Sequence, residues 1–81
     1  MKAQDLGDIA RMRLRSTAVV LEFTDEGGFG KVLTALEERR FVSHRWAVTD
    51  TAGAPIPGGM FWSGHYFCRL DEALDDYKAR L

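Results

Sequence analysis

The sequence is short of the features that most readily identify a class of protein. Its 81 residues contain one cysteine, Cys68, and two prolines. A lone thiol excludes an intramolecular disulfide and a zinc site built from several cysteines, and it favours a reducing, cytoplasmic setting. No apolar run has the length of a membrane span, and residues 1–15 lack the apolar core of a signal peptide.

An excess of charge of one sign is also lacking. Eleven Lys and Arg residues face twelve Asp and Glu residues, which gives a net charge of −1. A general attraction to nucleic acid or to anionic lipid is therefore excluded, and any such attraction requires a local patch. The composition, 46% hydrophobic and 28% charged, is that of a single globular domain over residues 1–81, in which residues 1–15 are poorly defined.

Hydrophobic periodicity predicts an α+β fold. Residues 1–15 fit a short helix that leads into a strand, and the loop over residues 50–59 holds both prolines. The remaining elements follow from β-branched runs, from alternation and from helical spacing. In chain order they are a strand over residues 16–24, a helix over 29–40, strands over 42–49 and 60–70, and a helix over 71–81.

The order βαββα predicts a three-stranded sheet, in strand order 1-3-2, with both helices on one face. This is a truncated ferredoxin-like fold that lacks its last strand. Alternation over residues 60–70 places Trp62 and Tyr66 toward the helices, in a core with Trp46, and places Phe61 and Phe67 on the opposite face. That opposite face is either uncovered or covered by the Arg-rich N-terminal segment.

Two patterns raise the question of a chemical site, and both are better explained by structure alone. Histidine, cysteine and aspartate are metal ligands, but alternation separates His44 from His65 on the two faces of the sheet, so too few ligands converge with Cys68 or Asp50. The turn GGFGK, residues 27–31, resembles a phosphate-binding loop, but Val32 stands where such a loop needs Ser or Thr. We therefore expect no catalytic residue, no metal and no cofactor.

Residues 63–74, SGHYFCRLDEAL, are similar to the third strand and second helix of an RNA-recognition motif. Gly64 and Phe67 match the strand signature of that family, whereas Ser63 and His65 replace its basic and aromatic residues. The resemblance implies an RNA-binding domain that stacks bases on the aromatic face of its sheet. With a net charge of −1, nucleic acid is an alternative partner and not the favoured one.

The favoured interpretation is a non-enzymatic protein-binding module that self-associates as a homodimer. Aromatic side chains beside arginines have the composition of an interface centre. The predicted contact residues share the second face of the sheet and its rim: Phe61, Phe67, His65, Arg69 and Arg45. In its size and single-domain organisation the chain resembles, as a class, the small inhibitor proteins of phages and mobile elements, anti-CRISPR proteins among them. That resemblance implies inhibition by steric occupancy of a partner whose identity the sequence does not give.

Overall fold

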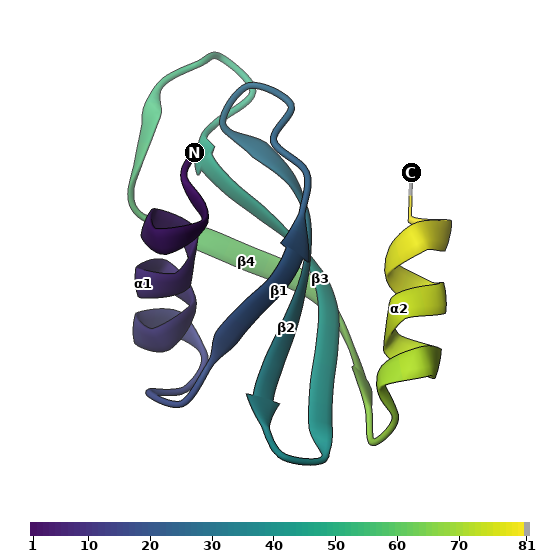
Figure 1. Ribbon diagram of the computed structural model, residues 1–81. Coiled ribbons are helices and arrows are strands. Elements are labelled where there is room, and N and C mark those ends of the chain that lie inside the picture. The colour runs from purple at the N-terminus through teal and green to yellow at the C-terminus, as the bar shows by residue number, and fades with distance from the viewer. Residues whose placement is uncertain (81) are drawn as a thin grey trace.

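The computed structural model describes residues 1–80 and shows an α+β fold with the order αββββα (Figure 1). A helix precedes four strands, and a second helix follows them. The elements are α1 (Ala3–Arg13), β1 (Val19–Phe23), β2 (Phe29–Glu37), β3 (Arg40–Thr49), β4 (Pro55–Phe67) and α2 (Leu70–Ala79). Neither helix is long and apolar enough to cross a membrane, as far as residues 1–80 are concerned.

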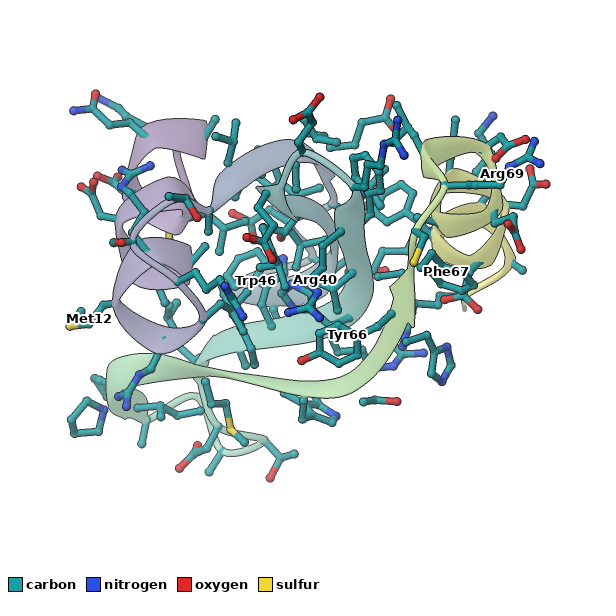
Figure 2. The ribbon with its side chains drawn as sticks, turned by 90° about the horizontal axis from the view of Figure 1, so that it is seen from below. Met12, Arg40, Trp46, Tyr66, Phe67 and Arg69 are labelled. Carbon is teal, nitrogen blue, oxygen red and sulfur yellow. The ribbon has the colours of Figure 1, made fainter. Side chains whose placement is uncertain are left out.

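The four strands form one antiparallel meander in the order β1-β2-β3-β4, and the two helices cover opposite faces of it. The backbone of helix α1 comes closest to β1 and β4, the two edge strands, whereas that of α2 comes closest to β2, β3 and β4. In Figure 2, β4 sweeps from beneath α1 to α2. The predicted truncated ferredoxin-like fold, with strand order 1-3-2 and both helices on one face, is therefore wrong.

The prediction failed at residues 29–40, which form strand β2 and the turn after it instead of a helix. Val32, Thr34 and Leu36 alternate toward α1, while Leu33 packs against α2. A strand that is buried on both faces reads as a continuous apolar run, and its period of two is lost. The apolar residues then match helical spacing by coincidence.

The face of the sheet toward α1 holds the larger part of the core. Leu6 of α1 packs on Val32 and Trp46, and Ala10 packs on Leu36 and Val42. Trp46, labelled in Figure 2, is fully buried, as predicted. Its indole N–H donates to the Thr24 carbonyl oxygen at 3.0 Å, so the polar atom of this large side chain is satisfied inside the core.

The face toward α2 has a smaller core, and polar contacts also hold α2 against it. Ala73 and Tyr77 of α2 pack on Leu33, with Phe41, Phe67 and Leu74 around them. Arg80 donates to the Ser43 hydroxyl at 2.6 Å and to its carbonyl oxygen at 2.7 Å. Lys31 lies 4.8 Å from the centre of the Tyr77 ring and donates to the carbonyl oxygen of Arg80 at 3.1 Å. Lys31 thus satisfies a carbonyl group at the C-terminal end of α2, and Arg80 ties that end of the chain to β3.

A bulge in β4 reverses the faces that simple alternation assigns. The register between β3 and β4 shifts between Arg45↔Trp62 and Ser43↔His65, and Ser63 in the shifted segment has a φ of 58°. The extra residue inverts the alternation between the two halves of the strand. Phe61 consequently faces α1 while Phe67 faces α2, so the prediction that both phenylalanines share one open face is wrong.

Candidate interaction surface

Helix α2 covers only part of its face of the sheet. Its last residues meet the sheet at Lys31, which contacts the Tyr77 ring and bonds the final carbonyl groups of the helix. The register of the strands continues past that point with Phe29↔Ala47↔Met60. These three residues lie on the same face as Lys31, because side chains two positions apart in a strand share a face.

The uncovered part of this face forms an open apolar groove of about 680 Å³. Three large apolar side chains along it are exposed: Phe29 (48%), Met60 (42%) and Trp62 (41%). Ala47 lies in the groove and is nearly buried. The other lining residues are Gly27, Thr49, Asp50, Thr51, Gly53 and Ile56. A groove of this size accommodates several apolar side chains of a partner.

Two tight turns shape the end of the groove distant from α2. A carboxylate oxygen of Asp50 accepts the backbone N–H groups of Ala52 (2.8 Å) and Ala54 (2.9 Å), which fixes the turn between β3 and β4. In the turn before β2, Asp25 accepts the N–H groups of Gly27 and Gly28, both with positive φ. Asp50 and Asp25 thus fix the two turns at this end of the groove through hydrogen bonds within each turn.

Charge differs between the two ends of the groove. Arg45 lies beside Trp62 at the end next to α2, and Lys31 lies on the other side of Arg45, as the pairing Lys31↔Arg45↔Trp62 shows. Asp50 lines the opposite end, and Glu26 is adjacent to Gly27 in the neighbouring turn. Asp50 lies five positions after Arg45, just past the end of β3, which corresponds to about 17 Å of extended chain. The groove is thus basic at one end, apolar in the middle and acidic at the other end.

The five predicted contact residues do not share one surface. Phe61 is partly buried beneath α1 and tilts against the ring of His44, with ring centroids 4.5 Å apart. Phe67 packs beside α2, as Figure 2 shows. The N-terminal segment therefore covers the aromatic face at Phe61, which is the second of the two arrangements that the sequence left open.

The polar members of the predicted set are also apart from one another. His65 is exposed, and its Nδ1 lies 3.0 Å from the carboxylate of Asp76 on α2. Arg69 precedes α2 and pairs with Asp71, at 2.6 Å. Burial alone would raise the pKa of Asp76, but hydrogen bonds from His65 and Ser43 lower it on balance. Of the five predicted residues, Arg45 borders the groove.

The groove residues that sequence reasoning missed are Phe29, Met60 and Trp62. Trp62 was assigned to the core with Tyr66, but both are exposed and lie on opposite faces. The signal was present in the glycine pairs and in the Ser63-Gly64 step of β4, because glycine inside a strand marks bulges. A register break at Ser63 would have separated Trp62 from Tyr66.

His44 and His65 lie on opposite faces of the sheet, so they do not form a joint site. His44 is buried beneath α1: its Nδ1–H donates to the Arg45 carbonyl oxygen at 3.4 Å, and its Nε2 accepts from the Thr34 hydroxyl at 3.0 Å. Burial lowers the pKa of His44 to about 4. Within residues 1–80, no three His, Cys, Asp or Glu side chains are placed to share a metal ion.

The arrangement expected for RNA binding is altered as well. The GGFGK turn, residues 27–31, leads into strand β2 at Phe29 and does not precede a helix. Arginines of the N-terminal segment are engaged in local contacts: Arg15 pairs with Glu37, and Arg13 bonds the carbonyl groups of Pro57 and Gly58. The RNA-recognition motif needs a helix between its first two strands, and a turn occupies that place between β1 and β2.

Comparisons of this chain with protein-family models, with curated proteins and with solved structures find no match. The function is therefore argued from the surface alone.

Proposed function

We propose that this protein is a non-enzymatic protein-binding module that acts by occupying the surface of its partner, with the apolar groove as its binding surface. The observation that carries the proposal is the exposure of Phe29, Met60 and Trp62 around one groove. Aromatic residues and methionine are enriched in interface centres and depleted elsewhere on protein surfaces. We place this activity in the cytoplasm, where the exposed thiol of Cys68 stays reduced.

The faces of the sheet are better suited to this role than its edges. Strand β1 has a register shift between Val20 and Glu22, and such a bulge interrupts pairing with another strand. Strand β4 begins at Pro55, contains Pro57 and is bonded along its first part by Arg13. Both edge strands thus have features by which proteins avoid pairing with a strand of another chain. The groove has no such feature.

The test compares two double variants in a capture experiment. Met60→Ser with Trp62→Ser removes two groove anchors, and Met12→Ser with Tyr66→Ser removes a methionine and an aromatic residue from exposed positions outside the groove. Each variant is immobilised and exposed to an extract of the cells that make the protein, and retained proteins are quantified by mass spectrometry. Central anchors typically contribute more than about 2 kcal/mol each, or roughly thirtyfold in affinity.

We expect one or more proteins to be retained by the wild type and by the Met12, Tyr66 variant, and to be lost from the groove variant. Circular dichroism must show equal folding of all three proteins. Equal retention of every protein by the groove variant would contradict the proposed function.

A further inference from the structure

The distribution of charge along the groove makes it complementary to itself. One end carries Lys31 and Arg45, and the other carries Asp50 with Glu26 close by. When two copies face each other across a two-fold axis through the middle of the groove, the basic end of each copy meets the acidic end of the other. The same contact is then made twice, as in any isologous interface.

We propose that a second copy of this chain occupies the groove, in a two-fold dimer with Met60 and Trp62 at its centre; the inference rests on the proposed function of the groove. Around the axis, each Trp62 is placed against the apolar floor of the partner copy. Arg45 lies two positions before Ala47 and Asp50 three positions after it, so an axis near Ala47 and Met60 brings Arg45 of one copy close to Asp50 of the other.

The size of the groove sets the strength of this dimer. The contact is three strands wide, or about 14 Å, and about 17 Å long, and a footprint of this size buries less than the roughly 800 Å² per partner of a standard interface. An interface at the low end of the size range is weak and reversible. We therefore expect a dissociation constant of about 10 μM to 1 mM.

The experiment is a charge exchange measured by sedimentation equilibrium at protein concentrations up to about 1 mM. Arg45→Glu places a carboxylate opposite Asp50, and Thr51→Lys places an ammonium group opposite Arg45. Thr51 is exposed and lines the groove, and this change leaves the Asp50 turn intact. Each change acts twice in a two-fold dimer, so we expect about fivefold to tenfold weaker association for either variant alone.

The double variant, Arg45→Glu with Thr51→Lys, restores opposite charges across the axis and should associate within about twofold of the wild type. Arg39→Glu and Ser16→Lys change the net charge equally at exposed positions outside the groove, and they should leave the association unchanged. Circular dichroism checks the fold, and Thr51→Lys with Ser16→Lys remains decisive if Arg45→Glu is unfolded.

Three outcomes would overturn the inference. A wild type that stays monomeric to about 1 mM excludes the second copy, while the proposed function still stands if partner capture depends on the groove. Association that Thr51→Lys leaves unaffected excludes this charge arrangement. A folded double variant that associates more weakly than both single variants excludes the two-fold register.

Discussion

Protonation of His44 is expected to destabilise this protein in mild acid. The ring is 2% exposed and lies against Phe61 and Thr34 beneath α1. Burial, with a smaller contribution from the positive charge of Arg80, lowers its pKa from 6.5 to about 4. In the unfolded chain the ring takes up a proton near pH 6.5, whereas in the folded protein it stays neutral, so acid favours the unfolded chain.

The sign and size of the effect follow from this difference. Above pH 6.5 the ring is neutral in the folded and in the unfolded chain, so it does not change the free energy of unfolding. That free energy falls progressively as the pH drops from about 6.5 to about 4. At about 1.36 kcal/mol per pH unit, the loss is roughly 2 kcal/mol at pH 5 and at most about 3.4 kcal/mol. This is a large share of the stability of a small domain.

Urea denaturation at pH 8, 7, 6 and 5 measures the effect. His44→Gln keeps a polar partner for Thr34 and removes the titrating ring, so its stability should change little over this range. His65→Gln, which changes an exposed histidine, should retain the wild-type loss. A wild-type loss below about 0.5 kcal/mol at pH 5, or an equal loss in His44→Gln, would refute the burial argument.

Two further predictions concern the core. Trp46→Ala should cost about 3–5 kcal/mol and leave the chain largely unfolded, whereas Trp62→Ala should melt near the wild-type temperature, since one ring is fully buried and the other is exposed. Thermal melts followed by circular dichroism compare them, and similar losses in both would contradict the assigned faces. Gly30→Ala should cost about 1–3 kcal/mol, because its methyl group would overlap the Thr24 carbonyl that accepts the Trp46 indole; a urea midpoint equal to that of the wild type would exclude this overlap.

Local sequence patterns predicted the elements with one clear periodicity. The strand over 42–49 and the C-terminal helix lie close to β3 and α2, because apolar and polar residues alternate along the first and apolar residues recur at helical spacing along the second. The failure at β2 has a physical cause. Its side chains are buried under a helix on each face, and a strand of that kind lacks the polar alternation by which strands are recognised.

The groove lies partly in the aromatic stretch that the sequence singled out, but most of its residues are not the contact residues predicted there. The aromatic stretch Gly58–Phe67 does supply Met60 and Trp62 to the groove, and Arg45 borders it. The faces of the side chains were assigned wrongly because one bulge residue, Ser63, reverses the alternation of the residues that follow it in β4. Phe29 was missed because its segment was assigned to a helix. Which half of a sheet face a helix leaves uncovered depends on tertiary packing, which periodicity does not describe.

The central claim is that a second copy of this chain binds in the groove around Phe29, Met60 and Trp62. Amide chemical shifts measured by two-dimensional NMR, as the protein is diluted from about 1 mM to 20 μM, test it residue by residue. The account predicts that shift changes concentrate at Ala47, at Met60 and at the indole N–H of Trp62, while Tyr66 stays constant. Changes confined to the exposed β1 residues Val19 and Leu21 would contradict it.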